Sequence, residues 1–170
     1  PLIVAAKHQS MLDTLMPFLL LEDPAIVLKE ELLHTPIFGW YAANLRMIPV
    51  LREANAAALR ALLKAARPAI EEGRQIWIFP EGTRREPGAR GDYKPGVAAL
   101  YKDLNVPVAP IALDTGRCWP AKGLMRRPGV VTIEILDPIP AGLPRAEFMG
   151  RLEATIDNAS EALAAERFPQ

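Results

Sequence analysis

Short apolar runs alternate along this chain with longer segments of helical spacing, and this alternation constrains the fold more than any other feature. The runs have the length and composition of buried strands and cover residues 2–6, 25–29, 47–50, 75–79, 106–113 and 130–136. The segments with helical spacing are 11–21, 36–45, 54–72, 95–104 and 144–167. Strands that alternate with helices predict an α/β fold, with a mostly parallel mixed sheet flanked by helices.

Two of the helical segments carry additional signals. In the last one, apolar residues recur every three or four positions: Phe148, Leu152, Ile156, Ala159 and Leu163. This stripe predicts a helix that lies across the sheet, and Pro144 suits its first turn. The segment 54–72 is rich in Ala and Leu and is followed by Gly73, but Pro68 predicts a kink or a restart after Arg67.

Length and composition limit the possible functions. The chain has 170 residues without internal repeats or a linker, so we expect one domain over residues 1–170. Lys plus Arg equals Asp plus Glu at 20 each, so no global positive field attracts nucleic acid. One cysteine excludes an internal disulfide, and no His/Cys cluster has metal-ligand spacing, so we expect no metal.

The length of the apolar runs and the start of the chain bear on where the protein is located. No apolar run approaches the ~20 residues that span a bilayer. The chain opens with Pro1 and enters an apolar segment at once, without an initiator Met or a polar lead-in. We therefore expect a truncated N-terminus, from which a membrane-anchoring part is missing. The expected location is the cytoplasmic face of the cell membrane, by peripheral contact or through residues before Pro1.

A histidine and a carboxylate, His8 and Asp13, follow the first predicted strand five residues apart. Inside one helix this spacing would separate the side chains by about 140°. With His8 on the loop and Asp13 in the first helical turn, the carboxylate can point back to the imidazole. His8 is then a candidate base that activates an alcohol, and Asp13 fixes its tautomer.

The same segment has a second interpretation. Ser10-x-x-Asp13 before an apolar run is a capping-box pattern, which needs no catalysis. The two interpretations are compatible, because Ser10 can cap the helix while Asp13 faces His8.

Three candidate phosphate ligands lie after two of the predicted strands. The run 75–79 leads into a Gly-containing turn with Arg84, Lys94 directly precedes a predicted helix, and Arg52 follows the run 47–50. Ligands bind at the carboxyl ends of strands in open α/β sheets, and helix N-termini favour anions. The alternative for each cation is an ordinary solvated surface charge, which is how we interpret Arg85 and Arg90.

Four ordered motifs resemble those of the glycerolipid acyltransferases, and the likeness is closest to the bacterial 1-acylglycerol-3-phosphate acyltransferase branch. The motifs are His8-x4-Asp13, the segment 39–52, Phe79-Pro80-Glu81-Gly82-Thr83-Arg84, and Val106-Pro107-Val108-Ala109-Pro110. They cover nearly the whole chain, and the FPEGTR block is highly specific. The resemblance implies a glycerol-3-phosphate acyltransferase-like fold.

The resemblance also implies a reaction and a set of site residues. The reaction is transfer of a fatty acyl group from acyl-CoA or acyl-carrier protein to the free hydroxyl of 1-acylglycerol-3-phosphate, giving phosphatidic acid, without a cofactor or metal. His8 and Asp13 would be the catalytic dyad, and Pro110 would shape the floor of the site. The residues that would bind the glycerol phosphate are Arg52, Glu81, Gly82, Thr83, Arg84 and Lys94. Lys7, where Asn is common, and Leu51, where Asp is frequent, depart from the family pattern.

Other functions stay open at this point. The acceptor could be glycerol-3-phosphate or another lysolipid such as an amino-acid lipid. If water takes the place of the alcohol, the protein is a thioester hydrolase. If the chain has no catalytic activity, it is a lipid-binding module. The expected partners are a lysophospholipid, the acyl donor and a membrane surface. For the surface, a Gly/Pro-rich loop mixes apolar and basic residues: Trp119, Leu124, Met125, Arg126 and Arg127.

Overall fold

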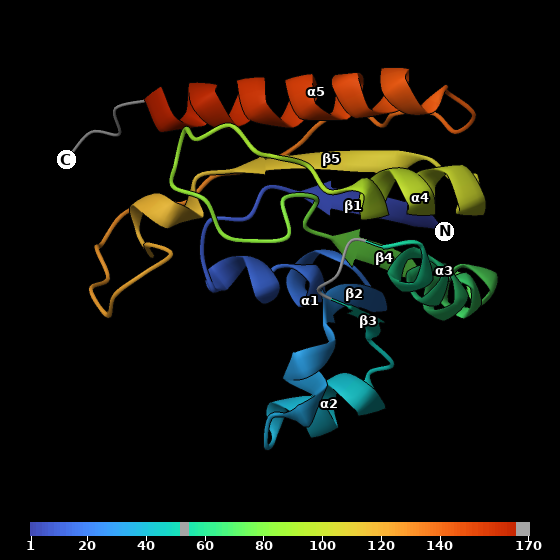
Figure 1. Cartoon of the computed structure of the whole chain (residues 1–170). Coiled ribbons are helices and arrows are strands. Elements are labelled where there is room, and N and C mark those ends of the chain that lie inside the picture. The colour runs from blue at the N-terminus through green and yellow to red at the C-terminus, as the bar shows by residue number, and fades with distance from the viewer. Residues whose placement is uncertain (52–54, 166–170) are drawn as a thin grey trace.

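The sheet has six strands in the order β3-β2-β4-β1-β5-β6 (Figure 1). The computed structural model describes residues 1–51 and 55–165. The strands are β1 (Leu2–Ala6), β2 (Pro24–Lys29), β3 (Ile48–Val50), β4 (Gln75–Ile78), β5 (Val108–Leu113) and β6 (Ile133–Ile135). Neighbouring strands from β3 to β5 pair in parallel, and only β6 runs antiparallel to its neighbour β5. The predicted mostly parallel α/β sheet is confirmed.

Helices cover both faces of this sheet. They are α1 (Pro17–Leu20), α2 (Phe38–Asn44), α3 (Ala56–Glu71), α4 (Pro95–Leu104) and α5 (Arg145–Ala165). Short 3-10 turns cover Leu12–Thr14, Glu30–His34 and Thr115–Arg117. As predicted, α5 lies lengthwise over the sheet, while α2 projects away from it on the other side (Figure 1).

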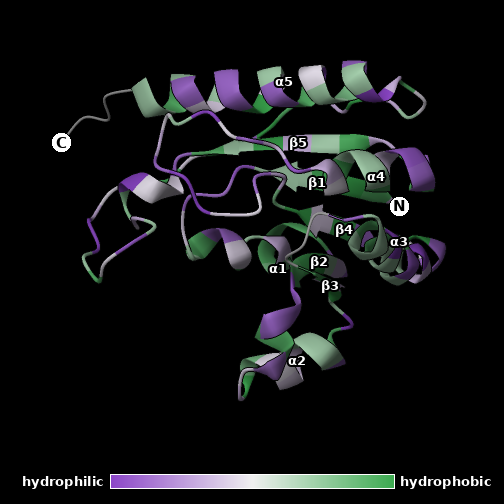
Figure 2. Cartoon of the chain, viewed as in Figure 1, coloured by the Kyte–Doolittle hydropathy of each residue, from purple (hydrophilic) through white to green (hydrophobic). Residues whose placement is uncertain are grey.

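The central strand β1 shows how the alternation of side chains builds two cores. Ile3 and Ala5 belong to a buried cluster that includes residues of α3, α4 and α5. Val4 and Ala6, which point to the opposite face, belong to a second cluster with Met16 and residues of α2 and β4. Because both faces of β1 are buried, the strand is apolar throughout, and the ribbon of the central strands is mostly hydrophobic in Figure 2.

The predicted helix over residues 11–21 is wrong as one element. The segment forms the 3-10 turn Leu12–Thr14 and then the short helix α1. Pro17 has no N–H group to donate to the carbonyl four residues earlier, so it starts a new turn instead of continuing the first. The break leaves Asp13 in a tight turn directly behind His8.

The other predicted elements differ from the structure mainly at their ends. α3 is continuous with Pro68 inside it, so the predicted restart after Arg67 is wrong, and Gly73 follows it with a φ of 80°. The last predicted strand, 130–136, is reduced to the three residues of β6. Residue 54, where the α3 segment was predicted to begin, and residue 167, where the last was predicted to end, lie outside the described residues.

The topology gathers three connections at one edge of the sheet. Because β4, β1 and β5 are adjacent and parallel, the segments that follow their last residues emerge side by side. These segments begin at Lys7, Phe79 and Asp114. They carry the first and third sequence motifs, so the order of strands brings together motifs about 70 residues apart in the chain.

Candidate active site

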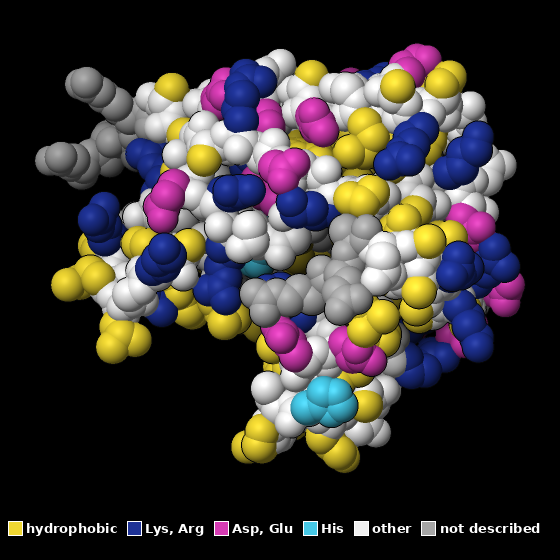
Figure 3. All heavy atoms as spheres, viewed as in Figure 1, with side chains coloured by type: hydrophobic (Ala, Val, Ile, Leu, Met, Phe, Trp, Pro, Cys, Tyr) yellow, Lys and Arg dark blue, Asp and Glu magenta, His cyan; other side chains and the backbone are white. Residues whose placement is uncertain are grey.

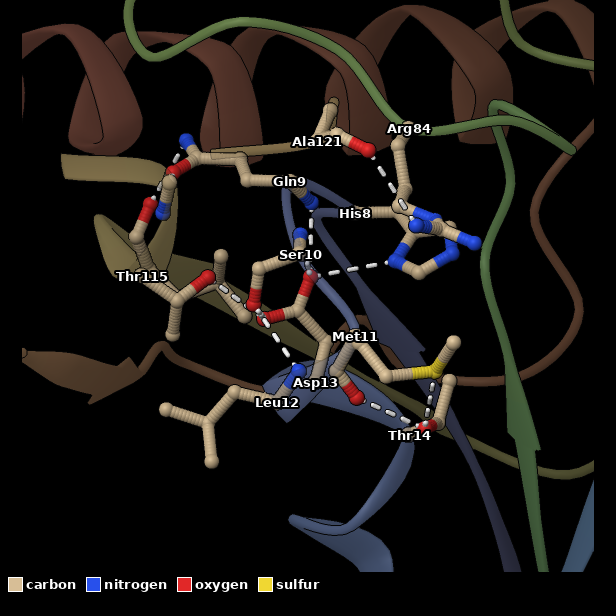
Figure 4. A network of polar contacts seen from close by, with 12 residues as sticks. His8, Gln9, Ser10, Met11, Leu12, Asp13, Thr14, Arg84, Thr115 and Ala121 are labelled. Carbon is tan, nitrogen blue, oxygen red and sulfur yellow. Dashed lines mark hydrogen bonds and ion pairs between the residues drawn. The ribbon is translucent and has the colours of Figure 1, made fainter. Parts of the chain in front are cut away.

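His8 and Asp13 form a hydrogen-bonded pair at this edge. Nδ1 of His8 lies 3.0 Å from Oδ2 of Asp13, and the two side chains are labelled in Figure 4. The His8 side chain is 12% exposed, whereas that of Asp13 is fully buried. Asp13 occupies Nδ1, so Nε2 is the ring nitrogen that can take a proton from a ligand. The ring also stacks on Phe79, with 4.0 Å between centroids and 19° between planes.

Asp13 is held by more groups than His8 alone. Its Oδ2 accepts hydrogen bonds from the backbone N–H groups of Gln9 and Ser10 at 2.6 and 2.8 Å, and its Oδ1 accepts from the hydroxyls of Ser10 and Thr115. Burial acts to raise the pKa of Asp13, but the hydrogen bonds, of which that to His8 is the strongest, together hold this pKa below its ordinary value. Asp13 therefore stays ionised beside the imidazole.

Ser10 takes part in this turn, but not as the N-cap predicted from the sequence: the N-cap residue of the 3-10 turn Leu12–Thr14 is Met11, which has no side-chain cap. Oγ of Ser10 accepts a hydrogen bond from the backbone N–H of Leu12 at 3.0 Å, and Asp13 reaches back to the N–H of Ser10. Because Ser10 accepts from the N–H two residues on, it closes a short turn, and the predicted capping box at the start of a helix is not formed. One carboxylate thus closes the turn and orients the histidine, as Figure 4 shows.

The last three residues of the third motif lie at the surface next to this pair. Gly82, Thr83 and Arg84 are exposed, and the backbone N–H of Arg85 donates to the carbonyl of His8 at 2.8 Å. Gly82 adopts a φ of 65°, a left-handed conformation that glycine takes without strain. The Arg84 guanidinium is exposed and donates to the carbonyl of Ala121 at 3.3 Å.

Lys94 lies beside the same turn. A Cβ atom on Gly82 would lie 3.4 Å from Cγ of Lys94, and the Lys94 backbone N–H donates to the carbonyl of Pro80 at 2.8 Å. Lys94 is the N-cap residue of α4, as its position before a helix predicted. Its ammonium is half-exposed and pairs with Asp92 at 2.6 Å. The structure therefore brings Gly82 and Lys94 together at the N-terminal end of α4.

Two of the predicted site residues, Glu81 and Pro110, lie away from the exposed turn. Glu81 is fully buried: its Oε2 accepts from the backbone N–H of His8 at 3.1 Å, and its Oε1 lies 2.9 Å from Nζ of Lys7. Burial raises the pKa of Glu81, although Lys7 acts to lower it. Pro110 is buried in β5, opposite Ala5 of β1, within the sheet that underlies the site. Arg52 lies outside the described residues.

Sequence reasoning missed several residues that support the pair. Thr115 bonds to Asp13, and the Gln9 side chain bonds to the carbonyl of Leu113 and the N–H of Gly116, which ties the loop after β1 to the loop after β5. Thr115 follows the β5 strand almost directly, so the rule that ligands gather after strands could have identified it. Gln9 offers no comparable signal.

Neither a metal cluster nor a membrane-spanning helix occurs in the part of the chain that the structure describes. No three His, Cys, Asp or Glu side chains within residues 1–51 and 55–165 are grouped so that they could hold a metal ion. None of the helices within the same ranges combines the length and the hydrophobicity needed to cross a membrane.

Comparison with known proteins agrees with the geometry. A family model described as acyltransferase matches residues 1–114. The chain is 37% identical over 135 residues to the 1-acyl-sn-glycerol-3-phosphate acyltransferase of Pseudomonas aeruginosa, with 79% of this chain and 52% of that protein covered. It is 25% identical over 166 residues to the human 1-acyl-sn-glycerol-3-phosphate acyltransferase beta, with 96% of this chain and 58% of that protein covered.

A solved structure shares the fold. The crystal structure of the 1-acyl-sn-glycerophosphate acyltransferase PlsC from Thermotoga maritima superposes with a TM-score of 0.73 at 28% identity, over 99% of this chain and 68% of that one. The chain spans about half the length of the curated relatives it matches. With the family model matching 114 of its 170 residues, this chain belongs to the acyltransferase family.

Proposed function

We propose that this chain is the catalytic domain of an O-acyltransferase that acts on 1-acylglycerol-3-phosphate. The enzyme transfers a fatty acyl group from acyl-CoA or acyl-carrier protein to the free hydroxyl of this acceptor, and the product is phosphatidic acid. The observation that carries the proposal is the buried His8 and Asp13 pair, with Nδ1 to Oδ2 at 3.0 Å, at the edge of the sheet next to exposed basic side chains.

In this reaction Nε2 of His8 removes the proton of the acceptor hydroxyl as its oxygen attacks the thioester carbonyl. The resulting imidazolium is stabilised by the ionised Asp13, which stays buried behind it. When the carbonyl re-forms, the carbon–sulfur bond breaks, and the proton on His8 passes to the departing thiolate. The products are an ester and a thiol, and His8 returns to its neutral form.

The phosphate of the acceptor binds to the basic residues around the third motif. Arg84 provides a fork of donors, Lys94 provides an ammonium at the N-terminus of α4, and Thr83 supplies a backbone N–H in an exposed turn. Gly82 shapes this turn, since its own N–H donates to the carbonyl of Phe79 at 3.0 Å. Arg52 joins this site in the proposal on the strength of its motif. Glu81 acts indirectly, because it accepts a hydrogen bond from the backbone N–H of His8. Pro110 forms part of the floor of the site.

The membrane surface that presents the acceptor meets two exposed apolar segments. One is the loop that carries Leu124 and Met125, which are 93% and 72% exposed, and the other is α2, where Trp40 is 65% exposed. In Figure 3, hydrophobic side chains lie at the tips of both projecting segments, with Lys and Arg side chains beside the loop. Arg126 stacks over Trp119 at 4.2 Å from the ring centroid, an arrangement suited to an anionic interface.

Acyl transfer is tested by following ester formation from labelled acyl-CoA and from acyl-carrier protein. Lysophosphatidate, glycerol-3-phosphate and a phosphate-free lysolipid are offered in parallel to the wild type and to His8→Ala. We expect phosphatidic acid from lysophosphatidate, and a loss of about 10²- to 10⁴-fold in His8→Ala. Release of free fatty acid without ester would identify a hydrolase, and equal rates for the two proteins would exclude His8 as the base.

A further inference from the structure

Lys7, the residue before the candidate base, has no exposed side-chain surface. Its ammonium lies 2.8 Å from the carbonyl of Ala89, 2.8 Å from Oδ1 of Asp157 and 2.9 Å from Oε1 of Glu81. The contact with Glu81 is an ion pair outside hydrogen-bond geometry, because Oε1 has no hydrogen-bond donor among the described residues. A buried ammonium must have such partners, since burial of an unpaired charge strongly destabilises the folded state.

The direction of the Lys7 side chain follows from the strand before it. Residues 3, 5 and 7 alternate onto the face that α5 covers, as the burial of Ile3 and Ala5 in the cluster with Phe148 shows. His8 is one residue further along, and its ring stacks on Phe79. The base and the buried ammonium therefore leave the same short segment in different directions.

The three partners of Lys7 lie on separate segments. Asp157 is in α5, and it also accepts hydrogen bonds from the hydroxyl of Tyr93 and the backbone N–H of Gly91. Glu81 follows β4, and Ala89 lies between Glu81 and α4. One side chain thus joins the end of β1 to α5 and to two points, Glu81 and Ala89, of the long loop between β4 and α4.

This network acts on the main chain of His8. Glu81, paired with Lys7 through Oε1, accepts from the N–H of His8 through Oε2, while the N–H of Arg85 donates to the carbonyl of His8. Both polar groups of the His8 backbone are therefore held by the segment 81–85. Without the Lys7 ammonium, the buried carboxylates of Glu81 and Asp157 would have no cation between them. The hydrogen bond that Glu81 accepts from the N–H of His8 would then change.

We propose that Lys7 is a positioning residue for the acyl transfer: through its ion pairs with Glu81 and Asp157 it holds the backbone of His8 in the position from which Nε2 reaches the acceptor hydroxyl. The inference rests on the proposed function, since it assigns His8 as the base. It also gives Glu81 a role inside the protein, in place of direct contact with the acceptor. Lys7 acts only through His8 and touches no substrate.

The test compares Lys7→Met with a matched control, Lys102→Met, which replaces an exposed lysine of α4. In the full-length protein we expect Lys7→Met to lower kcat about 10- to 100-fold, since a misplacement of ~1 Å can cost 10²-fold, and to leave KM for the acceptor within about twofold. Lys102→Met should match the wild type. Should Lys7→Met fail to fold, Lys7→Gln, which keeps an amide donor, replaces it with the same expectations.

A double variant separates positioning from mere stabilisation. Lys7→Met/Asp157→Asn removes one of the two uncompensated carboxylates, so its melting temperature should recover most of what Lys7→Met loses. Its kcat should stay low, because Glu81 still lacks the ammonium. Recovery of kcat in parallel with the melting temperature would mean that the network only stabilises the fold, and the proposal would be overturned.

A readout without activity distinguishes failure of this inference from failure of the proposed function. Histidine labelled with ¹³C at Cε1 gives an NMR signal for His8, assigned by its loss in His8→Gln. We expect Lys7→Met, but not Lys102→Met, to shift or broaden this signal, whether or not acyl transfer is detected. An unchanged His8 signal together with an unchanged kcat would refute the role of Lys7.

Discussion

Replacing Asp13 with Asn tests the central pair of the site with the smallest change of shape. An Asn oxygen at the position of Oδ2 can still accept from Nδ1 of His8 and from the backbone N–H groups of Gln9 and Ser10. In the wild type the hydroxyls of Ser10 and Thr115 donate to Oδ1 of Asp13. In the variant the NH₂ group of Asn can donate to these two hydroxyls instead. The variant therefore keeps the tautomer of the imidazole and removes only the negative charge behind it.

The magnitude follows from the one altered contact that changes during the reaction, the hydrogen bond between Asp13 and His8. A hydrogen bond to a charged group contributes about 1.5–3 kcal/mol. Here that energy is gained mainly when His8 becomes an imidazolium, so its loss raises the barrier to acyl transfer. With about 1.36 kcal/mol for each factor of ten, we expect kcat to fall roughly 10- to 150-fold, with little change in KM for the acceptor.

The assay measures initial rates of phosphatidic acid formation at saturating acyl donor over a range of lysophosphatidate concentrations. Thr115→Val is the matched control, because it removes a hydrogen bond from Oδ1 of Asp13 but leaves the pair with His8 intact. Its kcat should fall less than tenfold. If Asp13→Asn keeps kcat within twofold of the wild type while remaining folded, Asp13 does not stabilise the imidazolium and the reasoning is wrong.

The same variant has a signature in stability. Folding lowers the pKa of Asp13 from its ordinary value of 3.8, so its ionised form stabilises the native state above that pH. This contribution is lost as the pH falls through the pKa of the folded state. Asp13→Asn has no such charge, so the difference in free energy of unfolding between wild type and variant should be largest at neutral pH and shrink below pH ~4. Urea unfolding at several pH values measures it.

Three further predictions concern the phosphate site, the core and the surface. Arg84→Gln should raise KM for lysophosphatidate about 10- to 100-fold, from the loss of a charge-assisted contact, and leave KM for a phosphate-free lysolipid unchanged in the same ester assay. Phe148→Ala should lower the free energy of unfolding by about 3–5 kcal/mol in urea titrations, because Phe148 is fully buried and stacks on Tyr101 at 3.8 Å; a loss under 1 kcal/mol would contradict the packing. Leu124→Ser/Met125→Ser should weaken sedimentation with anionic vesicles, and unchanged partitioning would remove this loop from the proposed membrane surface.

Local features of the sequence were enough to predict the fold class and the pairing of His8 with Asp13. The alternation of apolar runs and helical spacing is decided by residues close together in the chain, and it identified the central strands and the longer helices. It did not predict the break at Pro17, the continuity of α3 through Pro68 or the shortness of β6. The helix breaks at Pro17 because proline lacks a backbone N–H group. The apolar residues on both sides of Pro17 fit one continuous helix, so the break was not predicted. His8 and Asp13 were found because five residues across a strand end place them within one turn.

The rest of the site depends on contacts between distant parts of the chain. Thr115 bonds to Asp13 across 102 residues, and Lys7 reaches Asp157 across 150, because the strand order places β1 between β4 and β5 and under α5. The sequence predicted Glu81 as a phosphate contact from its motif, whereas its burial against Lys7 emerges only from the packed structure. Periodicity and spacing are local properties that the sequence determines by itself. Which charges are buried together, and what they hold in place, is decided by packing, since burial and ion pairing depend on every segment that closes around a residue.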